Sequence, residues 1–223
     1  MNYVELVDRL RVLSAASGHE IKTVQQGMRP EAIRLAQWVQ DAWVDIQLMH
    51  DDWKFRQEVA AHVLEVNSNV LNTSEYQSSQ IAEWKVDQIR ISQPGEGISE
   101  SQLLNSVPWD TFKNQQGLMV KQRDKPCDCS VRPQDNAVVI YPAADKAYPV
   151  FYEYIREPQM LVHDDDEPII PEHFHRLIVY EAMLSYGFYE VATEVLEEAK
   201  RHRTRLLQDL RKRMLPGITA GSL

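Results

Sequence analysis

The sequence has few of the features that mark a secreted or membrane-spanning protein. It contains two cysteines, Cys127 and Cys129, whose spacing suits neither an unstrained disulfide along one strand nor a Cys-x-x-Cys zinc pair. No segment approaches the roughly 20 apolar residues that cross a bilayer. The segment from Met1 to Arg11 lacks the basic and apolar regions of a secretion signal. We therefore expect two free thiols, a reducing compartment and no membrane association.

Catalytic and metal-binding motifs are also missing. There is no Gly-x-Ser-x-Gly, no Gly-x-x-x-x-Gly-Lys and no Gly-x-Gly-x-x-Gly motif. His173 and His175 lie two apart at a helix start, which points them to different sides and favours capping or packing. The acidic run Asp164 to Asp166 lacks the glycine of a calcium loop, so we expect a solvated loop before a helix. The sequence predicts no enzyme, cofactor or metal; a metal-dependent hydrolase using Asp164 to Glu167 is the least favoured alternative.

The composition is that of a folded globular protein. Hydrophobic residues make up 43% of the chain and charged residues 26%, and five Trp and nine Tyr argue against disorder. The formal net charge of −9 disfavours general binding to a phosphate backbone. An interaction with nucleic acid would therefore depend on a local patch.

Helical periodicity appears at both ends of the chain. Apolar residues recur every three or four positions in the segment 3–13 and again from Pro30 to about His50. Pro171 marks the first turn of a third helix, which Gly187 is expected to interrupt. A last amphipathic helix runs from about Ala192 to Met214 and ends at Leu215-Pro216-Gly217.

The middle of the chain has the pattern of strands and turns. The strand candidates, rich in β-branched and aromatic residues, are Arg56 to Val66, Trp84 to Ile91, Cys127 to Arg132, Ala137 to Tyr141 and Val150 to Ile155. The segment from Asn114 to Pro126 is expected to be a long exposed loop or an arm. The sequence thus predicts an α+β fold, in which the segments 1–52 and 160–217 form a helical bundle, 53–159 an inserted antiparallel β-rich domain, and 218–223 a flexible tail.

The second half of the last helix is strongly basic. Its seven positive residues are Lys200, Arg201, Arg203, Arg205, Arg211, Lys212 and Arg213, against the single acidic Asp209. Because glutamates occupy the first half of the helix, the helix dipole explains part of this distribution. Three interpretations remain: a solvated helix face, an Arg-rich surface for a protein partner, or a contact with DNA.

Several segments resemble, in order, the head-to-tail adaptor (connector) proteins of tailed bacteriophages. They extend over most of the chain and consist of core and turn residues. These segments are Tyr3 to Leu10 with Ser17-Gly18, Trp38 to Gln47, Asp110 to Phe112, Val138 to Ala143, Tyr152 to Gln159, Ile170 to His175, and Ile178 to Met183 with Tyr186-Gly187. The resemblance implies a bundle of helices that carries a β-rich domain, in agreement with the periodicity.

The resemblance also implies a structural role in the virion. Such adaptors form a ring, typically of twelve copies, that sits under the portal protein, receives a tail nozzle or tail-tube protein, and passes double-stranded DNA through its lumen. The expected location is the neck of the virion, after assembly in the host cytoplasm. The C-terminal helix and tail commonly engage the portal, which makes the seven basic residues together with Ile218 and Leu223 the candidate portal-binding residues. The alternative is a nucleic-acid-binding protein that uses the basic helix.

Overall fold

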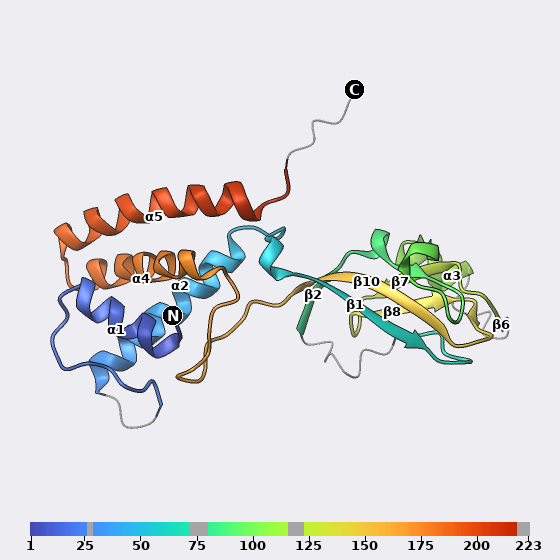
Figure 1. Ribbon diagram of the computed structural model, residues 1–223, viewed down its shortest axis with the longest axis horizontal. Helices are drawn as coiled ribbons and strands as arrows, with labels where there is room; N and C mark the ends of the chain where they lie inside the picture. Colours follow the sequence, from blue (N-terminus) through green and yellow to red (C-terminus); the bar gives the residue numbers. More distant parts are fainter. Residues whose placement is uncertain (26–28, 72–79, 116–122, 218–223) are drawn as a thin grey trace. The chain divides into compact units, whose positions relative to one another are not determined.

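The computed structural model describes residues 1–25, 29–71, 80–115 and 123–217, and these form parts of two compact units (Figure 1). The first unit combines Met1–Arg56 with Pro158–Leu223, and the second unit is the continuous segment Gln57–Glu157. The first unit is helical and the second is rich in strands. The predicted α+β class, with strands inserted between N- and C-terminal helices, is confirmed.

Within its described residues, the first unit contains four α-helices: α1 (Tyr3–Leu13), α2 (Pro30–Leu48), α4 (His175–Tyr189) and α5 (Thr193–Met214). A capping box starts α1, because the Asn2 side chain accepts the Glu5 N–H while the Glu5 carboxylate accepts the Asn2 N–H. Pro30 starts α2, at a position where its missing N–H costs nothing. These two helices therefore begin where local sequence signals place them.

The core of the first unit surrounds α4, which contacts α1, α2 and α5. Its fully buried side chains come from all four helices and include Leu6, Trp43, Ile178 and Leu210. Burial at such positions contributes about 1.5–3 kcal/mol for each large apolar side chain. None of the helices in the described ranges is long and apolar enough to cross a membrane.

The second unit contains a five-stranded sheet and two smaller ones. The five-stranded sheet consists of β1 (Gln57–Leu64), β10 (Tyr148–Arg156), β3 (Arg90–Ile91) and β4 (Gln102–Leu103) in that order, with β2 (Ile81–Trp84) also paired to β10. The smaller sheets are β5 (Asn105–Ser106), β7 (Asp128–Arg132) and β8 (Ala137–Tyr141), and the pair β6 (Arg123–Asp124) with β9 (Ala143–Ala144). A short helix, α3 (Trp109–Gln115), precedes residues that lie outside the described ranges.

Pairing within the second unit is mainly antiparallel, with parallel contacts only where short strands meet. β1 pairs with β10 in eight consecutive antiparallel positions, whereas β5–β7 and β6–β9 are parallel. The interior of the unit is aromatic and aliphatic, with Trp84, Tyr152 and Ile140 among its buried residues. Trp84 lies 5.3 Å from the Tyr152 ring and donates its indole N–H to the Asn136 carbonyl.

The structure corrects three predicted elements. The expected strand from Trp84 to Ile91 is wrong, because the 3-10 turn Val86–Gln88 divides it into β2 and β3, which pair with different stretches of β10. Gly187 does not interrupt its helix, because α4 continues to Tyr189. The α-helical part of that element begins at His175, after a 3-10 turn that follows Pro171.

Candidate interaction site on the last helix

Helix α5 packs one face against the other helices of the first unit and exposes its opposite face to solvent. Ala199, Leu207 and Leu210 are buried, and they lie on one side of the helix. The helix packs along α4, as Figure 1 shows. This close approach needs Gly187, because a Cβ atom there would lie 2.7 Å from Leu196 Cγ. The glycine thus serves helix–helix packing rather than helix termination.

Polar contacts strengthen the attachment of α5 to α4. Arg203 Nε donates to Glu181 Oε2, and both side chains are mostly shielded, with 27% and 13% of their surface exposed. The His202 ring stacks on Tyr180 with 4.9 Å between ring centroids. The Arg203 side chain therefore binds Glu181 within the first unit. His202 itself is half-buried.

Two further basic side chains of α5, and the backbone of its last turn, make contacts at the surface of the first unit. Lys200 forms an exposed ion pair with Glu197 at 3.6 Å. Arg211 Nε donates to His50 Nε2 at 3.1 Å, and the Arg213 carbonyl accepts Lys54 Nζ at 3.5 Å. The last turn is thereby linked to the segment that follows α2.

The candidate surface, which we call the basic face, consists of Arg201, Arg205 and Lys212. All three are exposed. Their spacing of four and then seven residues places them on one side of the helix, over a rise of about 16 Å. The remaining predicted site residues, Ile218 and Leu223, lie outside the described residues.

The glutamates of α5 lie toward its N-terminus and its basic residues toward its C-terminus. Glu194 is in the first turn, and Arg211, Lys212 and Arg213 are in the last. Each group opposes the partial charge of its helix end, which stabilises the helix by about 0.3–1 kcal/mol per favourable charge. This distribution accounts for the charge in the last turn. It does not account for Arg201 and Arg205 in the middle of the helix.

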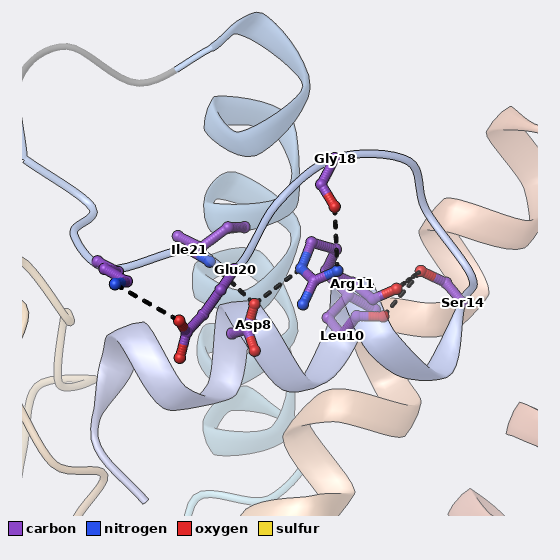
Figure 2. A network of polar contacts seen from close by, with 8 residues as sticks. Asp8, Leu10, Arg11, Ser14, Gly18, Glu20 and Ile21 are labelled. Atoms are coloured by element: carbon purple, nitrogen blue, oxygen red, sulfur yellow. Dashed lines mark hydrogen bonds and ion pairs between the residues drawn. The ribbon is translucent and has the colours of Figure 1, made fainter.

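A second polar network fixes the loop after α1, and the sequence did not predict it. Asp8 accepts Arg11 Nε at 2.7 Å and the Ile21 N–H at 2.9 Å, and Arg11 also donates to the Gly18 carbonyl (Figure 2). Partial burial alone would raise the pKa of Asp8, but these hydrogen bonds and the Arg11 charge lower it overall. No sequence signal links Asp8 to Ile21, because the contact closes a loop of irregular backbone.

The loop fixed by Asp8 forms one wall of a pocket of about 500 Å³. The pocket is lined by side chains of both charges, among them His19, Glu20, Lys22 and Arg29. Lys22 and Glu20 form an exposed ion pair at 3.7 Å. The lining does not select for one ligand charge, so the basic face remains the better-defined surface.

The acidic run Asp164 to Asp166 binds neighbouring backbone and side-chain groups, and it is less exposed to solvent than predicted. Asp164 accepts the Thr23 hydroxyl at 2.7 Å and the Val24 N–H at 2.6 Å. Asp166 accepts the N–H groups of residues 162 and 163, and these hydrogen bonds lower its pKa. Of the three aspartates, Asp165 is exposed and the other two are half-buried. Within the described ranges, no group of three or more His, Cys, Asp or Glu side chains could hold a metal ion.

His175 and the two cysteines have ordinary structural environments. His175 is buried between the Met1 amine and the Ile170 carbonyl, each 2.9 Å from a ring nitrogen. Burial lowers the pKa of His175. Cys127 is exposed and Cys129 is buried, and both are free thiols.

Comparison with known proteins identifies a family. Residues 1–220 match the family described as SU10 adaptor protein, which covers both units and all of α5. No curated protein matches the chain. Family members are structural adaptors, in agreement with the core and turn residues that carried the resemblance in the sequence. The chain belongs to the SU10 adaptor protein family of bacteriophage head-to-tail adaptors.

Proposed function

We propose that the chain forms an adaptor ring between the DNA-filled head and the tail of a bacteriophage, and that the basic face of α5 docks it on the portal. The observation that carries the docking site is the position of Arg201, Arg205 and Lys212 on the exposed side of a helix whose other side is buried. The family assignment supports the adaptor role.

The fixed position of α5 makes its basic face suitable for a protein partner. The buried side chains, the Arg203–Glu181 pair and the His202–Tyr180 stack hold the helix before any partner arrives. A surface that is already ordered loses little conformational entropy on binding. Arginine is also enriched in protein interfaces. The partner surface should therefore be acidic, and its affinity should fall as salt screens the charges.

In the assembled virion, twelve copies of the chain form the ring. The segment 218–223 adds a second contact with the portal, and a tail nozzle or tail-tube protein binds the opposite side of the ring. The genome passes through the lumen of the ring. A net charge of −9 is compatible with this passage, because an acidic lining would not retain DNA.

The docking site can be tested with two charge reversals, Arg201→Glu and Arg205→Glu, in one protein. The matched control reverses Arg9 and Arg176, which are exposed on other helices of the same unit. Each double variant changes the net charge by the same amount, so only position differs. Co-sedimentation with purified portal particles should fall at least tenfold for the α5 variant and stay near the parent level for the control. Equal binding by both variants would exclude the basic face from docking.

The same face supports a second candidate, direct binding of DNA. Three basic side chains along about 16 Å of helix could contact separate phosphates of one strand, which follow one another about every 3.4 Å along the duplex axis. This binding would be weak and steeply dependent on salt, because the rest of the surface is acidic. A gel-shift titration of the parent with duplex DNA at low salt tests it. Absence of a shift while portal binding persists would eliminate this candidate.

A further inference from the structure

Strand β1 lies at one end of the five-stranded sheet and has an open outer edge. Its eight residues pair with β10 without a register shift, and the described part of the chain places no strand along its other side. In an antiparallel strand, every second residue directs its N–H and C=O groups to each side. The outer edge therefore presents backbone donors and acceptors over about 27 Å.

The two faces of β1 differ in chemistry. The even-numbered side chains face the interior: Leu64 is buried, and Glu58 accepts the Tyr154 hydroxyl at 3.0 Å and pairs with Arg156 at 2.8 Å. The odd-numbered side chains face solvent. Val59 exposes 68% of its surface and Val63 exposes 54%, with an exposed Ala61 between them. The solvent-facing side chains in the middle of β1 are therefore all uncharged: Val59, Ala61 and Val63.

Natural edge strands usually carry devices that prevent pairing with another chain. Typical devices are lysine, proline, a bulge or an inward-pointing charge. Strand β1 contains no lysine and no proline, and its pairing with β10 has no bulge. Its one acidic side chain, Glu58, is held by Arg156 within the same unit. The edge thus remains able to accept a further strand.

The exposed pattern of β1 is its own complement. If two copies of the strand run antiparallel with Ala61 opposite Ala61, Val59 of each copy faces Val63 of the other. No like charges meet in this register, and the apolar rows of the two copies become continuous. We propose that β1 of the free chain pairs with β1 of a second copy about a two-fold axis at Ala61.

The size of this contact sets its strength. One strand edge is smaller than the roughly 800 Å² per partner of a standard interface, so the dimer belongs to the weak, concentration-dependent class. Because each copy carries a net charge of −9, added salt should favour the dimer. The pairing goes beyond the proposed function and does not depend on it, since it needs neither portal nor tail.

Single cysteine substitutions test the register directly. In a Cys127→Ser background, Ala61→Cys would place two thiols opposite each other, where Cα atoms of paired strands are about 4.5–5.5 Å apart and a disulfide can form. Val59→Cys would place its two thiols about 13 Å apart, which is too far. Leu48→Cys, on the exposed side of α2, reports random collisions.

The full-length variants are oxidised mildly at high protein concentration and separated on a non-reducing gel. We expect at least fivefold more linked dimer for Ala61→Cys than for Val59→Cys or Leu48→Cys, and a further increase with salt. Equal linking in all three variants, or no linked dimer with Ala61→Cys, would overturn the pairing. Circular dichroism of each variant verifies the fold. Portal co-sedimentation is a separate assay, so failure of the docking proposal would not be mistaken for failure of this one.

Discussion

Replacing Gly187 by alanine tests how closely α4 and α5 pack. In an open helix this change would stabilise the protein by about 0.5–1 kcal/mol, because glycine loses more backbone entropy on folding. Here the new Cβ would lie 2.7 Å from Leu196 Cγ and 2.8 Å from its Cδ2. Overpacking of this kind costs about 1–3 kcal/mol. We therefore expect a net loss of about 1 kcal/mol in the free energy of unfolding.

Urea unfolding followed by far-UV circular dichroism measures this loss, since the helices of the first unit dominate the signal. Ser185→Ala, at an exposed position of α4, is the control and should be neutral or slightly stabilising. Combining Gly187→Ala with Leu196→Ala should remove the clash, so the double variant should lose less than the sum of the single losses. The reasoning is refuted if Gly187→Ala is as stable as the parent, or if the two changes are additive.

Three further predictions concern ionisable side chains. Arg203→Ala should lower the free energy of unfolding by about 1–3 kcal/mol because it leaves Glu181 shielded without its partner; in a double-mutant cycle, zero coupling between the two residues would disprove this. Because the folded pKa of Asp8 is lowered, its contribution to stability is present above the unfolded pKa of about 4 and disappears as the pH falls through the folded pKa. Urea midpoints measured between about pH 5 and pH 2 should therefore fall less for Asp8→Asn than for the parent; equal slopes would contradict this. Burial and the nearby Asp128 charge raise the pKa of Cys127, and burial raises that of Cys129 to about 12. A thiol reagent should thus modify Cys127 slowly and Cys129 only in denaturant, and fast labelling of two thiols in the native protein would contradict this.

The sequence predicted the elements that depend on local signals. Apolar periodicity together with Pro30 located α2, and clusters of β-branched and aromatic residues located β1, β7, β8 and β10. The two-residue strands β3, β4 and β5 were not predictable, because they exist only through pairing with distant segments. Gly187 was misinterpreted because sequence alone cannot distinguish a glycine that ends a helix from one that admits a neighbouring side chain.

The candidate site was predicted as a stretch of sequence but not as a surface. Its charge was visible in the composition of residues 200–213. The division between Arg203, which binds Glu181, and Arg201, which faces solvent, depends on how α5 rotates against α4. A rotation of the helix by two residues, about 200°, would exchange their roles. The pocket beside Asp8 could not be predicted from the sequence. Its wall is irregular backbone, which a hydrogen bond from the Ile21 N–H to Asp8 holds in place.

The start of α1 depends on residues that are synthesised much later. The Tyr3 N–H donates to the Asp166 carbonyl and the Val4 N–H to the Asp164 carbonyl, so the loop before α4 satisfies two groups of the first turn. At about 5–20 residues per second, the ribosome completes the whole strand-rich unit before this loop emerges. The inserted unit is continuous in sequence and can fold during synthesis, whereas the helical unit must wait for α4 and α5. A released fragment that ends at Glu157 should accordingly protect its strand-rich unit from protease while α1 and α2 remain sensitive.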